Sequence, residues 1–149
     1  MAASPRSMRA ALHRARLRVT RGLRVTYNPR TDGKPDPGEV VWAWVPYEED
    51  ASQGKDRPVL LIARDRKRLY GLMLTSQDHD RDAADEARHG RYWMDVGAGG
   101  WDRERRPSEV RLDRLLTLAT GDVRREGAAL DRPMFERVIA AADRFHSFG

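Results

Sequence analysis

The sequence contains no cysteine. This excludes a disulfide scaffold, a cysteine-ligated zinc site and a thiol nucleophile. No apolar run approaches the roughly 18 residues that span a bilayer, so we expect no membrane partner. There is no internal repeat, no P-loop and no dinucleotide fingerprint, because Gly97-Ala98-Gly99 is only a lone Gly-x-Gly. What is present, 149 residues of which 40% are hydrophobic, fits one folded domain with a substantial core.

Acidic residues are absent from the start of the chain. Residues 1–30 hold eight arginines and no Asp or Glu, a formal charge of +8, whereas residues 31–149 hold 20 Lys and Arg against 23 Asp and Glu, a charge of −3. The overall charge of +5 therefore resides in an N-terminal arm. Such an arm is typical of contact with nucleic acid or with an acidic partner. The remaining body has to be judged on its local patches.

The arm has more than one interpretation. It lacks the continuous apolar segment of a secretory signal, but its acid-free composition with Arg, Ala and Ser resembles an organelle transit peptide. The alternatives are a basic extension on a cytosolic, bacterial-type protein, or an over-extended reading frame whose true start is Met8. We favour these alternatives and expect a cytoplasmic protein.

A turn-rich stretch separates the arm from the rest of the chain. Ser4-Pro5 is a typical helix start, and apolar residues recur at helical spacing as far as Val19, which predicts a marginal helix over 4–19. Residues 28–38 then contain Asn-Pro, Asp-Gly and Pro-Asp-Pro-Gly, which are turn signals. We therefore predict a basic N-terminal extension and linker over residues 1–37 and a folded domain over residues 38–149.

The body has the pattern of a small β protein. Short apolar, β-branched or aromatic segments predict strands at 40–45, 58–63, 69–75, 91–96 and 109–118. Residues 76–90 lack periodicity and are expected to form a charged loop. A C-terminal helix is predicted from the Asp131 cap and an apolar stripe that runs to Phe145. Because no crossover helices separate the strands, we expect a mainly β fold of the α+β kind, a small barrel or strongly bent sheet of about five strands with one closing helix.

Four stretches, in this order, are similar to the motifs of one protein family. Residues 37–42 read Pro-Gly-Glu-Val-Val-Trp, and residues 53–62 read Gln-Gly-Lys-Asp-Arg-Pro followed by four apolar residues. Residues 74–76 are Leu-Thr-Ser, and residues 108–118 contain Val-Arg-Leu-Asp and then Thr-Leu. Together they resemble the MazF/PemK family of toxins from bacterial toxin–antitoxin pairs, over about residues 38–145.

The resemblance implies a fold, an activity and partners. It implies an SH3-like barrel with a C-terminal helix, present as a homodimer. It implies an endoribonuclease that cleaves single-stranded RNA without a metal or other cofactor, through attack of the 2′-hydroxyl on the adjacent phosphate. It also implies a cognate antitoxin whose tail lies across the RNA site. Residues 1–37 have no counterpart in the short members of the family.

Cleavage of this kind needs positive charge on the phosphate as it becomes pentavalent, a base for the 2′-hydroxyl and an acid for the leaving oxygen. Arg57 lies between a Gln-Gly loop and a buried strand, and it matches a catalytic arginine of the family; the alternative is a surface arginine paired with Asp56 or Glu49. Thr75 ends an apolar strand, where a hydroxyl can donate to a phosphate oxygen, and it matches a family residue with a catalytic or positioning role; the alternative is an ordinary strand residue or a cap.

Arg111 and Asp113 are two residues apart, which places them on one face of the predicted strand. PemK-like members use this Arg and Asp in the active site, so Arg111 is expected to clamp the phosphate while Asp113 orients it or accepts the 2′-proton. The alternative is an ion pair on a solvated face. The PemK-like branch also has a His shortly before its Arg-Pro, which residues 48–52 lack. The general base therefore stays open among Glu48, Glu49, Asp113 and His79.

The remaining candidates are expected to bind RNA. Four tryptophans, Trp42, Trp44, Trp93 and Trp101, are candidate platforms for base stacking. Trp42 and Trp44 are predicted to belong to the core, and Trp101, in a Gly-rich and charged loop, is the better exposed candidate. His79, between Asp78 and Asp80, is also compatible with a metal cluster, but we expect no metal. The predicted RNA-binding residues are Gln53, Lys55, Ser76, His79, Trp101 and Arg103.

Two other functions compete with the nuclease. The first is a barrel without cleavage activity that binds nucleic acid, RNA or DNA, or a protein such as a topoisomerase; the missing loop His favours it. The second makes the N-terminal arm the main nucleic-acid contact. The nuclease hypothesis requires that Arg57, Thr75 and Arg111 converge on one groove, which is a geometric test.

Overall fold

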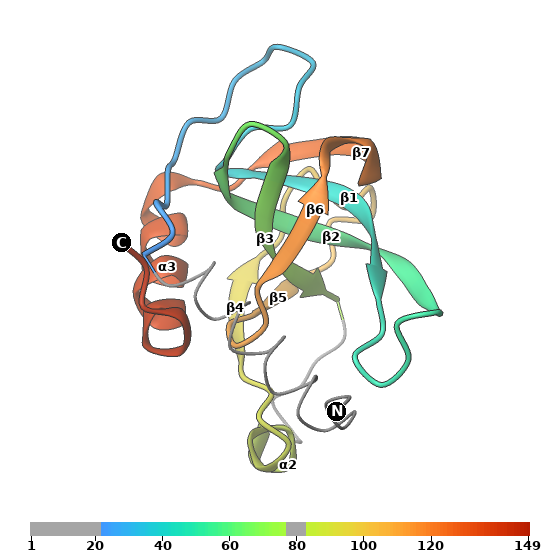
Figure 1. The fold of residues 1–149 in the computed structure, drawn as a ribbon, viewed down its shortest axis with the longest axis vertical. Helices are drawn as coiled ribbons and strands as arrows, with labels where there is room; N and C mark the ends of the chain where they lie inside the picture. The colour runs from blue at the N-terminus through green and yellow to red at the C-terminus, as the bar shows by residue number, and fades with distance from the viewer. Residues whose placement is uncertain (1–21, 77–82) are drawn as a thin grey trace, which may run out of the picture.

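The computed structural model describes residues 22–76 and 83–149, and its strands form one antiparallel sheet (Figure 1). The predicted helix over residues 4–19 lies outside the described residues. The elements in chain order are β1 Glu39–Pro46, β2 Gly54–Arg64, β3 Arg68–Thr75, α2 Ala83–Arg88, β4 Trp93–Gly97, β5 Ser108–Arg111, β6 Leu116–Ala119, a 3₁₀ turn Thr120–Asp122, β7 Val123–Ala129 and α3 Arg132–His146.

The sheet has the order β4-β5-β3-β2-β1-β7, and β6 also pairs with β3. Every pairing is antiparallel, and register shifts in β1–β7 and β2–β3 bend the strands. Alternate residues of β2 enter two different buried clusters: Leu60 and Ile62 lie in the larger one, and Val59 and Leu61 in the smaller one. The sheet is therefore apolar on both faces, as expected for a strongly curved sheet rather than a flat one.

The helix α3 closes one of these faces. Asp131 caps it by accepting the Met134 N–H at 3.1 Å, and Pro133 lies in the first turn, as predicted. Phe135, Val138 and Ala142 on its apolar stripe are buried in the larger cluster. No helix in the described residues is both long and apolar enough to cross a membrane.

The predicted mainly β fold with a C-terminal helix is confirmed, and the described residues form seven strands rather than about five. The predicted single strand over 109–118 is wrong: β5 pairs with β4 and the end of β3, whereas β6 pairs with the beginning of β3, and residues 112–115 carry the chain between them. The charged loop expected over 76–90 contains α2, whose six residues are too few to show an apolar period. The strand β7 was not predicted, because its sequence Val-Arg-Arg-Glu-Gly-Ala-Ala is charged and contains a glycine.

The described part of the predicted extension packs on the barrel. The Thr26 N–H donates to the Ile62 carbonyl at 2.9 Å, and the Tyr27 hydroxyl donates to the Leu130 carbonyl at 2.7 Å. The Tyr27 ring also lies 5.0 Å from that of Phe135, measured between centroids. Residue 38 as the start of the domain stays a prediction, and residues 22–30 are in contact with the domain that follows.

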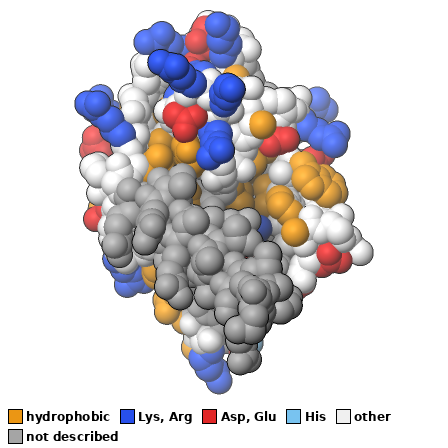
Figure 2. All heavy atoms as spheres, in the orientation of Figure 1, with side chains coloured by type: hydrophobic (Ala, Val, Ile, Leu, Met, Phe, Trp, Pro, Cys, Tyr) orange, Lys and Arg blue, Asp and Glu red, His pale blue; other side chains and the backbone are white. Residues whose placement is uncertain are grey.

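The exposed charges are mixed in sign on the face drawn in Figure 2. Lys and Arg side chains gather there, with Asp and Glu among them, at the end of the molecule that carries the β2–β3 hairpin. The hairpin contributes exposed Arg64, Arg66, Lys67 and Arg68 around Asp65. Asp65 accepts the backbone N–H groups of Lys67 and Arg68, which lower the pKa of its carboxyl together with the Tyr70 hydroxyl.

Candidate active site

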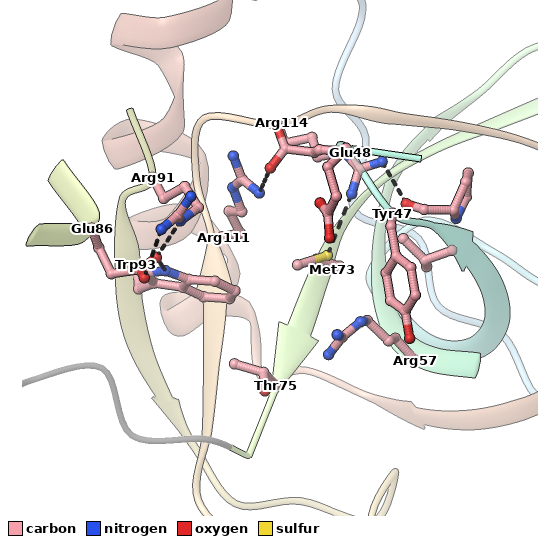
Figure 3. A pocket seen from close by; sticks show the side chains of 13 residues that line it. Tyr47, Glu48, Arg57, Met73, Thr75, Glu86, Arg91, Trp93, Arg111 and Arg114 are labelled. Carbon is pink, nitrogen blue, oxygen red and sulfur yellow. Dashed lines mark hydrogen bonds and ion pairs between the residues drawn. The ribbon is translucent and has the colours of Figure 1, made fainter. Parts of the chain in front are cut away.

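A cavity of about 360 Å³ opens where β2, β3 and β5 meet the β1–β2 loop and the segment from α2 to β4 (Figure 3). Its polar lining combines four arginines with three glutamates and one threonine. The lining residues are Val45, Pro46, Tyr47, Glu48, Glu49, Arg57, Met73, Thr75, Glu86, Arg91, Trp93, Arg111 and Arg114.

Arg57 and Thr75 enter the cavity from neighbouring strands (Figure 3). Val59 of β2 pairs with Met73 of β3, so the antiparallel register brings Arg57 and Thr75, two residues beyond this pair, to the same edge and face. Arg57 is partly buried, and no hydrogen bond or ion pair joins its side chain to another described residue. Its guanidinium therefore keeps all its donors for an incoming ligand. The structure does not contain the alternative pairing of Arg57 with Asp56 or Glu49.

Arg111 is a buried cation held by two carboxylates. Its side chain is 4% exposed; Nη2 donates to Oδ2 of Asp113 at 2.8 Å, and Nη1 donates to Oε1 of Glu48 on the β1–β2 loop. Burial lowers the pKa of Arg111, but the hydrogen bonds and charges of Asp113 and Glu48 more than offset it and raise that pKa above its ordinary value. The alternative of an ion pair on a solvated face does not hold for this residue.

Asp113 lies behind the cavity rather than in its lining. Besides Arg111, its Oδ1 accepts the Tyr92 backbone N–H at 2.8 Å, so it ties the end of β5 to the start of β4. Both carboxylate oxygens thus already accept hydrogen bonds. This arrangement suits a group that orients Arg111, whereas Glu48, with a side chain 45% exposed, reaches the cavity itself.

Arg114 is a third arginine of the cavity lining, and sequence reasoning did not single it out as functional. Its Nη2 donates to the Pro46 carbonyl at 2.8 Å, which joins the β5–β6 turn to the end of β1. Burial lowers the pKa of Arg114, and the nearby charges of Arg111 and Arg57 lower it further, although Glu48 and Glu49 oppose them. This competition is the physical sign of cations concentrated in one place.

A second cluster forms the opposite wall. Glu86 of α2 is 8% exposed; its carboxylate accepts Nε of Arg91 at 2.6 Å, Nη2 of Arg91 at 3.1 Å and Nε1 of Trp93 at 3.0 Å. The hydrogen bond and charge of Glu86 raise the pKa of Arg91. Arg91 and Trp93 occur in a segment predicted as a strand, but Glu86 lies in the predicted loop, where no periodicity distinguished it from its charged neighbours.

Apart from Trp101, the predicted RNA-binding residues fall into three groups. Gln53, Lys55 and Ser76 are exposed next to elements that form the cavity: Gln53 and Lys55 where the β1–β2 loop enters β2, and Ser76 directly after β3. Arg103 is exposed but is not part of the lining. His79, and with it the alternative metal cluster of Asp78 and Asp80, lies outside the described residues. Across 22–76 and 83–149, no group of three or more His, Asp or Glu side chains is arranged to hold a metal ion.

The predictions that Trp101 is exposed and that Trp44 belongs to the core are wrong. Trp101 is 4% exposed, with Nε1 donating to the Ser108 hydroxyl at 3.2 Å, and therefore cannot stack on RNA bases. Its ring folds back over Gly99, where an added Cβ would lie 2.1 Å from a ring carbon, so the small residue in the loop allows the indole into the core. Trp44 is instead 43% exposed, and Trp42 is partly buried with Nε1 donating to the Trp101 carbonyl at 2.7 Å.

The fold matches solved structures of a MazE–MazF complex from Deinococcus radiodurans in two crystal forms. For form II the identity is 16%, the match covers 76% of this chain and 96% of that chain, and the TM-score is 0.52. For form III the corresponding values are 15%, 77%, 98% and 0.53. At this level of identity the structural similarity shows the fold alone, and the fold is that of a MazF-like protein.

The family follows from the sequence match. The model of the PemK-like, MazF-like toxins of type II toxin–antitoxin systems matches residues 36–145, and the chain belongs to this family. No curated protein sequence matches the chain significantly. The resemblance drawn from the four sequence stretches is thus confirmed, and the protein is a toxin of a toxin–antitoxin system.

Proposed function

We propose that the protein is an endoribonuclease toxin that cleaves cytoplasmic single-stranded RNA by attack of the 2′-hydroxyl on the adjacent phosphate, without a metal. The observation that carries the proposal is the convergence of Arg57, Thr75 and Arg111, from three different strands, on one cavity. Arginine matches phosphate oxygens with paired donors, and two such groups facing one space supply the charge that a pentavalent phosphate needs.

The roles follow from what each side chain contacts. Arg57, with its donors unused, binds the scissile phosphate, and the Thr75 hydroxyl donates to one of its oxygens. Arg111 stabilises the charge that develops on the phosphate, and Asp113 positions Arg111. Glu48 is the proposed general base, because it is the carboxylate that both lines the cavity and contacts Arg111.

The surroundings supply the binding surface. Gln53, Lys55 and Ser76 are proposed to contact the RNA strand beside the cavity. By extension from the family, the chain acts as a homodimer, and a cognate antitoxin neutralises it by covering the same groove.

The test is cleavage of a synthetic single-stranded RNA in the presence of a chelator, with the ends of the products identified by mass spectrometry. Attack by the 2′-hydroxyl breaks the bond between phosphorus and the 5′-oxygen, which leaves a 2′,3′-cyclic phosphate on one product and a 5′-hydroxyl on the other. We expect wild type to cleave and Arg57→Ala to be slower by about 10²- to 10³-fold, as for loss of one donor to a transition-state oxyanion.

The matched control is Arg124→Ala, which removes the same charge from an exposed arginine that pairs with Asp56 outside the cavity lining. It should cleave like wild type. Absence of cleavage by wild type, with RNA binding intact, would favour the non-catalytic barrel instead. Equal rates for wild type and Arg57→Ala would remove the assignment of this arginine.

A further inference from the structure

The wall of the cavity opposite Arg57 carries an aromatic side chain with no role in the chemistry proposed above. Trp93 lies in β4, directly across from Arg111 of β5 in the antiparallel register. Side chains of such a pair lie on one face of the sheet with their Cβ atoms about 5 Å apart. The indole is therefore the immediate neighbour of the guanidinium that faces the phosphate (Figure 3).

The indole is held in a defined orientation. Its Nε1 donates to Oε2 of Glu86 at 3.0 Å, and the same carboxylate is fixed by two hydrogen bonds from Arg91. Trp93 is partly buried: it packs against the smaller core cluster, which includes Met73, and it also lines the cavity. A ring supported by the core and fixed at its polar atom loses little conformational entropy when a flat ligand stacks on it.

The other aromatic in the lining differs in this respect. Tyr47 belongs to the β1–β2 loop, and its hydroxyl makes no hydrogen bond within the described residues. Trp93 is thus the aromatic of the cavity wall that is anchored to a strand and oriented by a buried carboxylate.

We propose that Trp93 is the stacking platform for the nucleobase next to the scissile phosphate, and that Glu86 and Arg91 position its ring. The proposal rests on the proposed function, because it assumes that a phosphate of single-stranded RNA lies at Arg57 and Arg111. A base joined through its sugar to that phosphate reaches the neighbouring wall, where an indole offers a face that any base can use. Trp93 therefore takes the place that sequence reasoning assigned to Trp101.

The experiment measures binding without cleavage. The probe is a single-stranded oligonucleotide of mixed sequence with 2′-O-methyl groups throughout, which removes the nucleophile, and its partner is an abasic oligonucleotide of the same length. We expect Trp93→Ala to bind the base-containing probe about 10- to 100-fold more weakly, the range of one base–aromatic stack, and to bind the abasic probe like wild type. Trp93→Phe should retain most of the affinity.

Trp44→Ala is the matched control, because Trp44 is 43% exposed and lies outside the cavity lining. Its affinity for both probes should equal that of wild type. Tryptophan fluorescence gives a second measurement that does not depend on the alanine variant: quenching by the base-containing probe should be present in wild type and absent in Trp93→Phe.

The failures are distinguishable. If wild type binds neither probe, the proposed function itself fails. If wild type binds, two results for Trp93→Ala would overturn the stacking role: an unchanged affinity for the base-containing probe, or an equal loss of affinity for both probes. Quenching that persists in Trp93→Phe would overturn it as well.

Discussion

Nη2 of Arg111 lies 2.8 Å from Oδ2 of Asp113, two residues further along the chain, and the other oxygen of Asp113 accepts the Tyr92 N–H at 2.8 Å. The pair sits where β5 ends, with the Arg111 side chain only 4% exposed. A guanidinium at that depth is stable because Asp113 and Glu48 face it, since an unpaired buried charge is costly. The same carboxylate thus stabilises the fold and aims a cation at the cavity.

We expect Asp113→Ala to lower the free energy of unfolding by about 3 kcal/mol, because it leaves a buried cation with one partner fewer. Urea denaturation at neutral pH is the measurement. Asp113→Asn keeps an oxygen for the Tyr92 N–H and should lose less. The control is Glu136→Ala, which breaks the exposed pair with Arg132 on α3 and should change stability by no more than about 0.5 kcal/mol. If Asp113→Ala is as stable as this control, Asp113 does not support Arg111.

Glu48→Gln tests the proposed general base. Glutamine keeps the shape and a hydrogen bond to Arg111 but cannot accept the 2′-hydroxyl proton, so kcat should fall about 10²- to 10⁴-fold, while KM stays equal or falls as a negative charge leaves the groove. Glu49→Gln, in the same lining, is the control and should retain the wild-type rate. A Glu48→Gln variant as fast as wild type would show that Glu48 is not the general base.

Much of the fold could be predicted, because the spacing of apolar residues and the positions of turn residues match the observed strands and the C-terminal helix. The run from Val40 to Val45, the run from Val59 to Ala63 and the Asp131 cap are local signals, and the structure bears them out. The break between β5 and β6 could not be predicted in this way, because it is set by which half of β3 each segment pairs with. Charge and glycine similarly concealed β7, whose place is determined by its pairing with β1.

The candidate site likewise contains residues that local motifs predict and residues that only tertiary contacts place there. Arg57, Thr75 and Arg111 were recognised in sequence motifs, and the structure brings them to one cavity. Glu86 and Trp93 belong to the opposite wall through a hydrogen bond between α2 and β4, which no single-segment pattern reveals. Trp101 was misjudged because its loop is rich in glycine and charge, and the backbone space at Gly99 is what lets the ring turn inward.

Asp36, in the turn before β1, provides a test of stability against pH. Asp36 is 6% exposed, and its Oδ2 has no hydrogen-bond partner in the described structure. Burial raises the pKa of Asp36, and the neighbouring Asp32 carboxylate raises it further, although Arg64 opposes the effect. A raised pKa means that the folded state binds this proton more tightly than the unfolded chain does. The stability that this bound proton contributes is fully present below the ordinary carboxyl pKa of about 4. It is lost as the pH rises through the folded-state pKa of Asp36, which is higher.

Asp36→Asn should therefore be more stable than wild type at pH 7, and the difference should shrink as the pH falls through the folded-state pKa of Asp36 to about 4. Denaturant midpoints measured across this range are the readout. Asp50→Asn is a control of opposite sign, because hydrogen bonds from Ser52 lower the pKa of Asp50 in the folded state. That variant should lose stability at pH 7 and approach wild type in acid. The interpretation that burial destabilises the ionised Asp36 carboxylate would be contradicted by either of two results. One is an Asp36→Asn variant less stable than wild type at pH 7, and the other is a gain in stability that persists unchanged in acid.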